Sequence, residues 1–222
     1  MEEKNEIKVD KEELKTEASN TVNQVKNTIK KVDIKKDSIE TKGFILDMFK
    51  DPLGKIKDIA AENSGKYLTY SIIILVIWIV SKLIYICFNF SNIWNLGENF
   101  ITIIKTAIQP ALIVLTMSII LFVMNQKNKK SLTTVLTVVI VANIPIVLSS
   151  IVDILRIVSS EIRIVANPFS SLCKLISVIL MYFAAKSLFK EDEDSKFIRK
   201  FVIIQVIYFT AYILFSLLGI YI

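Results

Sequence analysis

The residues best suited to chemistry in this chain are polar side chains that interrupt long apolar segments. Asp153 and Arg156 are three residues apart, so on a helix they share one face and can form an ion pair. An ionisable side chain in hydrocarbon is costly unless it reaches the interface or a partner, so each such position is a candidate site. The charged and amide candidates are Lys82, Lys105, Gln109, Asn143, Asp153 and Arg156.

Each charged candidate has two interpretations. Lys82 lies near the end of the first apolar segment and Lys105 near the start of the second. Both ammonium groups can therefore extend to the membrane interface, or they can share a polar site in the outer leaflet. Asp153 and Arg156 form either a local pair that caps the third segment or part of a gate for an ion or ligand.

Two prolines lie inside apolar segments, beside amide side chains. Pro110 follows Gln109, and Pro145 comes two residues after Asn143. Proline removes a helical hydrogen bond, so each should bend its helix, and neighbouring side chains can satisfy the freed carbonyl group. A transport pathway built around the two breaks is one possible use of this arrangement.

Several kinds of chemistry have no support in the residue types. The chain has no histidine and only two cysteines, Cys87 and Cys173, which argues against His-based metal sites and Ser-His or Cys-His catalysis. The apolar segments also hold no carboxylate pair at their centres. We therefore expect a protein that is not an enzyme and has no cofactor. The two cysteines can form a disulfide only if the first and fourth segments touch.

The elements that position these residues are predicted to be transmembrane helices. Hydrophobic residues make up 53% of the chain, and the mean hydropathy is +0.55. Five apolar segments each reach the roughly 20 residues that a membrane-crossing helix needs. The prediction is an all-α, polytopic membrane protein with a transmembrane domain at 66–222, whose spans are about 67–88, 101–124, 131–152, 169–189 and 201–222.

The chain before these spans divides into two parts. Residues 1–42 hold ten lysines and ten acidic residues, with a weak helical apolar stripe, and predict a charged cytoplasmic tail that is partly helical or disordered. Residues 43–65 alternate apolar and charged positions with a helical period and predict amphipathic helices at the membrane surface.

Two Asx-Pro pairs are predicted to mark where helices enter the membrane region. Asp51 is expected to cap a helix whose first residue is Pro52, because proline at that position loses no needed hydrogen bond. The amphipathic region would then consist of two pieces with a bend between them. Asn167 and Pro168 are expected to start the fourth span in the same way.

The distribution of Lys and Arg predicts the orientation and the partners. Basic residues are concentrated before the first span, between the second and third spans, and before the fifth span. This bias places the N-terminus in the cytoplasm and the C-terminus outside a plasma membrane. Positive charge beside apolar spans favours contact with the bilayer and its anionic lipid headgroups, and we expect no nucleic-acid partner.

The architecture resembles the YIP-type (Ypt-interacting protein) five-span family, as a bacterial relative. The resemblance rests on the charged N-terminal segment, the juxtamembrane sequence Asp51-Pro52-Leu53, the five closely spaced apolar segments and the short C-terminus. The Asp-Leu-Tyr-Gly-Pro type motif of the eukaryotic members is absent, so the resemblance does not imply binding of a small GTPase.

These features lead to three expectations for function. The first is a non-catalytic, YIP-like membrane adaptor or organiser with an unidentified membrane or cytoplasmic protein partner. The second is a small transporter or channel subunit that uses the polar residues and prolines of the second and third spans. The third is a membrane immunity protein that acts against a bacteriocin or stress.

Overall fold

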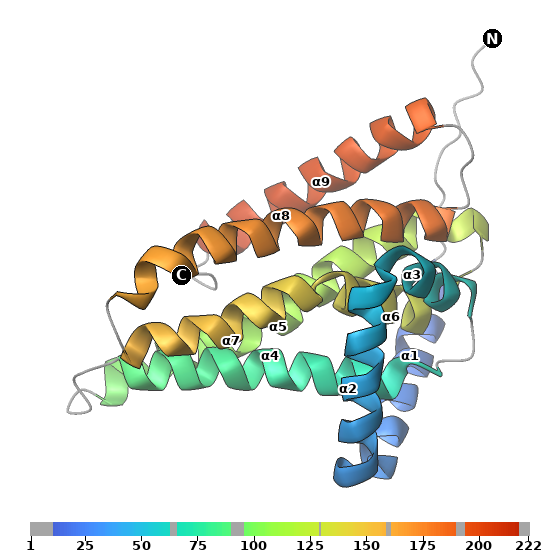
Figure 1. The fold of residues 1–222 in the computed structure, drawn as a ribbon. Helices are drawn as coiled ribbons and strands as arrows, with labels where there is room; N and C mark the ends of the chain where they lie inside the picture. Colours follow the sequence, from blue (N-terminus) through green and yellow to red (C-terminus); the bar gives the residue numbers. More distant parts are fainter. Residues whose placement is uncertain are drawn as a thin grey trace.

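The chain forms only helices in the part that the structure describes. The computed structural model describes residues 11–62, 66–89, 96–128, 130–158, 161–189 and 194–217. The ends of three predicted segments, residues 1–10, 63–65 and 218–222, lie outside this part. The α-helices are α1 (Lys11–Lys31), α2 (Ile34–Lys50), α3 (Pro52–Ala61), α4 (Leu68–Asn89), α5 (Leu96–Met124), α6 (Leu132–Ala142), α7 (Ile144–Val158), α8 (Ile162–Phe189) and α9 (Asp194–Leu217), with a short 3₁₀ helix at Gln126–Asn128 (Figure 1).

Several of these helices have the length and apolar character of membrane spans. Four of the described helices, α4, α5, α8 and α9, can cross a membrane by length and composition, and the bent pair α6–α7 makes a fifth if it counts as one span. In Figure 1, α4 to α9 lie roughly along one direction, and α4, α7 and α9 run opposite to α5 and α8. The structure thus confirms an all-helical fold whose helices are compatible with a multi-pass membrane protein.

The third predicted span breaks at Asn143. The axes of α6 and α7 differ by 46°, because Pro145 has no N–H to donate to the carbonyl group one turn earlier. That carbonyl group belongs to Val141, and Asn143 bonds to two other carbonyl groups in the last turn of α6. Its backbone N–H donates to the Ile140 carbonyl group at 3.0 Å, and its side-chain Nδ2 donates to the Val139 carbonyl group at 2.8 Å. The bend therefore leaves Val139 with a hydrogen-bond partner.

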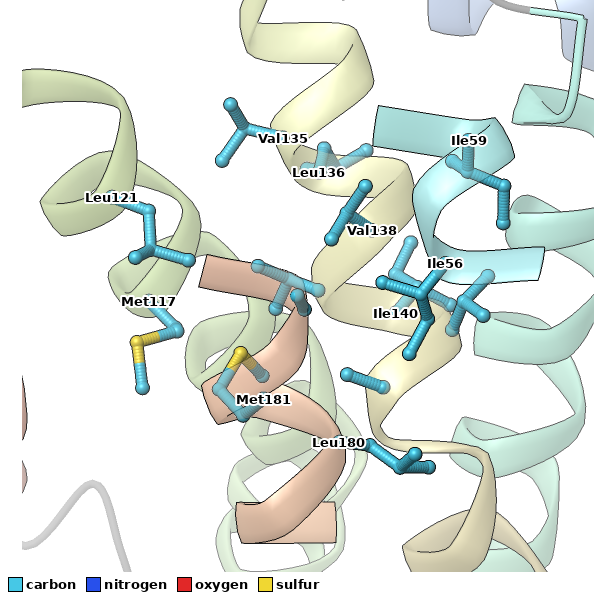
Figure 2. Close-up of a cluster of buried hydrophobic side chains, with 14 of the residues drawn as sticks. Ile56, Ile59, Met117, Leu121, Val135, Leu136, Val138, Ile140, Leu180 and Met181 are labelled. Atoms are coloured by element: carbon cyan, nitrogen blue, oxygen red, sulfur yellow. The ribbon is translucent and has the colours of Figure 1, made fainter. Parts of the chain in front are cut away.

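Helix α6 is the centre of the hydrophobic core. All ten of its residues from Thr133 to Ala142 are buried, and it packs against α3, α4, α5 and α8. Figure 2 shows Ile56 of α3 lying beside Ile140 of α6, with Met181 of α8 and Leu121 of α5 on the other side of α6. Helix α9 is the opposite case, because only Phe197 and Ile204 are buried along its length.

The charged N-terminal region packs on the long apolar helices. Helices α1 and α2 lie across one end of the bundle (Figure 1). Thr133 of α6 donates to Gln24 Oε1 of α1 at 2.6 Å, and Tyr70 of α4 donates to Glu40 Oε2 of α2 at 2.9 Å. Phe44 of α2 stacks on Tyr70 with ring centroids 5.3 Å apart. Helix α2 is continuous through residues 42 and 43, so the boundary expected there is not a break in the helix.

Helix α3 is held at both ends. Asp51 caps its N-terminus, with Oδ1 accepting from Gly54 N at 2.9 Å, and Pro52 is its first residue. At the C-terminus, Lys130 Nζ donates to the Ala61 carbonyl group at 3.4 Å, and Thr134 Oγ1 donates to the Glu62 carbonyl group at 2.9 Å. A cation at this end also complements the helix dipole.

We predict that Asp51→Ala and Gly54→Ala are strongly non-additive. Asp51→Ala removes the cap and should lower the free energy of unfolding by about 1 kcal/mol. A Cβ at residue 54 would lie 2.0 Å from Asp51 Oδ2, so Gly54→Ala should displace the cap. In the Asp51→Ala background this clash is gone, and Gly54→Ala should stabilise α3 by up to about 1 kcal/mol. A double-mutant cycle measured by denaturation in micelles tests this, and additive effects would contradict the cap.

The second Asx-Pro pair does not start a helix, contrary to the prediction. Helix α8 begins at Ile162, so Asn167 and Pro168 lie inside it. The preceding turn is held by contacts from α7, because Arg156 donates to the Ala166 carbonyl group at 3.0 Å and Ala166 is buried. Ser171 Oγ also donates to the Asn167 carbonyl group at 3.1 Å. Packing against α7 therefore extends the helix by more than a turn before the proline.

Candidate functional site

A cavity of about 580 Å³ lies between α4, α5, the α6–α7 break, α8 and α9. Each of these elements contributes at least one polar side chain to its wall. The lining residues are Trp78, Lys82, Gln109, Pro110, Ile113, Met117, Asn143, Ile146, Lys174, Ser177, Val178, Met181, Gln205, Tyr208, Phe209 and Tyr212.

Four of the candidates from the sequence line this cavity. Lys82 comes from α4, Gln109 and Pro110 from α5, and Asn143 from the break between α6 and α7. Pro145 explains part of this convergence, because the bend beside Asn143 redirects α7 relative to α6. Gln109 of the second predicted span and Asn143 of the third therefore line one cavity.

Two other candidates within the apolar segments lie elsewhere. Lys105 and Pro145 are not among the described lining residues. Lys105 is half-buried on α5, and Pro145 is the second residue of α7. Pro145 thus acts on the cavity only through the bend.

Asp153 and Arg156 form the predicted ion pair, with Arg156 Nη2 2.9 Å from Asp153 Oδ1. The structure adds Lys82, whose Nζ lies 3.9 Å from Asp153 Oδ2. The Asp153 side chain is 14% exposed, so this carboxylate is largely withdrawn from the surface while it faces two cations. Lys82 therefore connects the ion pair to the cavity wall.

Two buried polar groups in the cavity wall have no hydrogen-bond partner. Trp78 and Ser177 are 2% and 3% exposed, and neither Trp78 Nε1 nor Ser177 Oγ has a partner in the structure. An unsatisfied buried polar group costs about 1–3 kcal/mol. Both groups line the cavity, so a molecule bound there can satisfy them.

The sequence analysis did not predict many of the residues that line this cavity. Trp78 and Ser177 sit in continuous apolar runs, and the fifth span contributes Gln205, Tyr208 and Tyr212. One available signal was the recurrence of Gln205, Tyr208 and Tyr212 at spacings of three and four, which puts them on one face of a helix. Lys174 was a further signal, because it is a charge inside the fourth apolar segment.

The structure does not bring the cysteines together. Both are free thiols, with Cys87 exposed and Cys173 buried. Among the residues that the structure describes, no three His, Cys, Asp or Glu side chains are grouped so as to hold a metal ion. The site thus consists of hydrogen-bonding groups, two lysines and apolar walls.

Comparison of the chain with protein-family models, with curated proteins and with solved structures finds no match.

Proposed function

We propose that this chain is a non-catalytic plasma-membrane protein that binds a small solute among its spans, as a small transporter or channel subunit does. In this proposal the bent pair α6–α7 counts as one span, which makes five spans, with the N-terminus in the cytoplasm and the C-terminus outside. The main support is the convergence of polar residues from every span on one cavity.

The character of the cavity supports binding rather than a packing defect. Its volume of about 580 Å³ is within the range of roughly 300–1,000 Å³ that small-molecule sites have. Empty cavities in proteins are usually apolar, whereas this wall holds amides, hydroxyl groups and two lysines. The unpartnered Trp78 and Ser177 also make an occupied cavity more favourable than an empty one.

Filling the cavity should strongly reduce flux. We expect liposomes that contain the full chain to pass at least one member of a broad panel of ions and solutes. Ser177→Phe places a large side chain in the cavity and should reduce that flux at least tenfold. Leu175→Phe is the control, because Leu175 is 58% exposed on the same helix and does not line the cavity. No flux across the panel, or equal flux in both variants, would contradict the proposal.

A second candidate is a YIP-like adaptor or organiser. The supporting observation is the charged α1–α2 layer, which is held on the bundle by Gln24 and Glu40 and presents exposed charges around them. Lys50 and Lys57 are exposed near the end of this layer and can contact anionic headgroups. Loss of co-purified proteins on deletion of residues 1–33, with flux unchanged, would favour this candidate. No observation on the described residues favours the immunity protein.

A further inference from the structure

The two lysines of the cavity wall lie toward one end of the cavity and its two methionines toward the other, with Gln205 of the antiparallel helix α9 on the methionine side. Helices α5 and α8 run in the same direction and opposite to α4 (Figure 1). On α8 the lining residues pass from Lys174 through Ser177 to Met181, over about 10 Å at 1.5 Å per residue. On α5 they pass from Gln109 to Met117 over about 12 Å. Both helices therefore place their polar lining residue toward the C-terminal end of α4 and their methionine toward its N-terminal end.

The polar end carries an excess of positive charge. Lys82 from α4 and Lys174 from α8 both line the cavity, and the described lining residues include no carboxylate. Asp153 lies next to Lys82, but it also pairs with Arg156, which is the closer partner. Among the described residues, Lys82 and Arg156 thus share the Asp153 carboxylate, and Lys174 adds a further cation to the cavity wall. A bound anion supplies the missing charge, and a bound cation adds to the repulsion.

The unpartnered groups in the wall also require an acceptor. The Trp78 indole can only donate a hydrogen bond, through Nε1–H, and the Ser177 hydroxyl can donate as well. Trp78 precedes Lys82 by four residues, or one helical turn, and Ser177 follows Lys174 by three. The donors are therefore about one turn deeper in the cavity than the cations on the same helices.

We infer that the cavity binds an anionic amphipath with a single apolar chain. Its carboxylate or phosphate headgroup contacts Lys82 and Lys174 and accepts from Trp78 or Ser177, and its chain extends toward Met117 and Met181. This inference deepens the proposed function by naming the class of solute. A headgroup with oxygen acceptors satisfies the lysines and the unpartnered donors together, and the methionine end provides an adaptable apolar wall.

Trp78 provides a direct readout of binding. The chain has two tryptophans, and Trp94 lies outside the described residues. The Trp94→Phe variant of the full chain therefore reports only on Trp78, in the cavity wall. In non-ionic detergent, decanoate should change the emission of this variant saturably. Decanol and decyltrimethylammonium should bind at least tenfold more weakly, because neither carries the negative charge.

Lysine variants locate the headgroup. Lys174→Gln should weaken decanoate binding at least tenfold, and Lys174 is exposed, so the substitution spares the core. Lys82→Gln should have a similar effect and leaves Asp153 paired with Arg156. Lys105→Gln is the matched control, since Lys105 is in a span but does not line the cavity, and should bind decanoate normally. Equal binding of decanoate and decanol, or normal binding by Lys174→Gln, would overturn the inference.

Two further binding experiments distinguish a soluble anionic amphipath from an anionic lipid of the bilayer. Decyl phosphate in detergent tests a soluble phosphate headgroup, and nanodiscs containing phosphatidylglycerol in place of phosphatidylcholine test a lipid of the bilayer itself. A Lys174-dependent change of Trp78 emission in either experiment supports the inference and assigns the source. Decanoate binding without flux in liposomes would refute transport and leave the inference standing, whereas flux without anion-selective binding would refute the inference alone.

Discussion

Replacing Asp153 with alanine should lower the free energy of unfolding by about 3 kcal/mol, because it leaves two cations without their shared carboxylate. Arg156 lies 2.9 Å from Asp153 and Lys82 lies 3.9 Å from it, and the three side chains are between 14% and 27% exposed. Unfolding by denaturant in mixed micelles measures the effect.

A matched control separates this effect from the general loss of a surface charge. Asp47 pairs with Lys55 at 3.6 Å, but the Asp47 side chain is 56% exposed. Asp47→Ala should therefore cost less than about 1 kcal/mol. If the two variants lost the same free energy of unfolding, the ion pairs of Asp153 would contribute no more than an exposed ion pair does.

The cluster can also be replaced as a whole. In a triple variant with Asp153→Leu, Lys82→Met and Arg156→Met, no charge of the cluster remains, and most of the stability lost in Asp153→Ala should return, apart from the contribution of the Arg156–Ala166 hydrogen bond. Binding of decanoate should nonetheless be weakened in this variant, because Lys82 is absent. This combination distinguishes the cost of breaking the ion pairs from their role in the cavity.

Replacing Ile56 with alanine should lower the free energy of unfolding by about 3 kcal/mol, the typical cost of a cavity left by a fully buried isoleucine. Ile56 is 0% exposed and lies between α3 and α6, beside Ile140 (Figure 2). Leu53→Ala on the same short helix is the control, because Leu53 is 37% exposed and should lose less than about 1 kcal/mol.

This second prediction tests how α3 is bound. If α3 only lay on the membrane surface, neither Ile56 nor Leu53 would be packed against another helix. Ile56→Ala and Leu53→Ala would then have similar small effects on the free energy of unfolding. A large, selective loss at Ile56, accompanied by faster proteolysis between α2 and α3, indicates that α3 is part of the folded core. Equal effects at the two positions would contradict the packing in Figure 2.

Features that depend on neighbouring residues in the chain followed from the sequence. The cap on α3 needs only Asp51, Pro52 and the backbone N–H of Gly54, which lie within one turn. The break at Asn143 lies two residues before Pro145, and the Asn143 side chain bonds to the Val139 carbonyl group one turn earlier. Such interactions are local, so residue types and spacing are sufficient to predict them.

The failure at Asn167–Pro168 shows the limit of local signals. The same kind of pair starts α3 but lies within α8, because residues 162–166 are held in a helix by α7. The hydrogen bond from Arg156 to Ala166 joins residues on two different helices. No property of the Asn-Pro pair itself distinguishes the two cases. Tertiary contacts decided which pair became a helix start.

The sequence by itself determined the all-helical, apolar class of this protein, the approximate extents of its long helices and the pairing of Asp153 with Arg156. Only the tertiary structure placed Lys82 beside Asp153 and brought Trp78 and Ser177 into one cavity wall. The reason is that an apolar side chain is nearly as stable against lipid as against another helix. A uniformly apolar span therefore carries little information about its rotation, and packing between helices decides which side chains face the cavity.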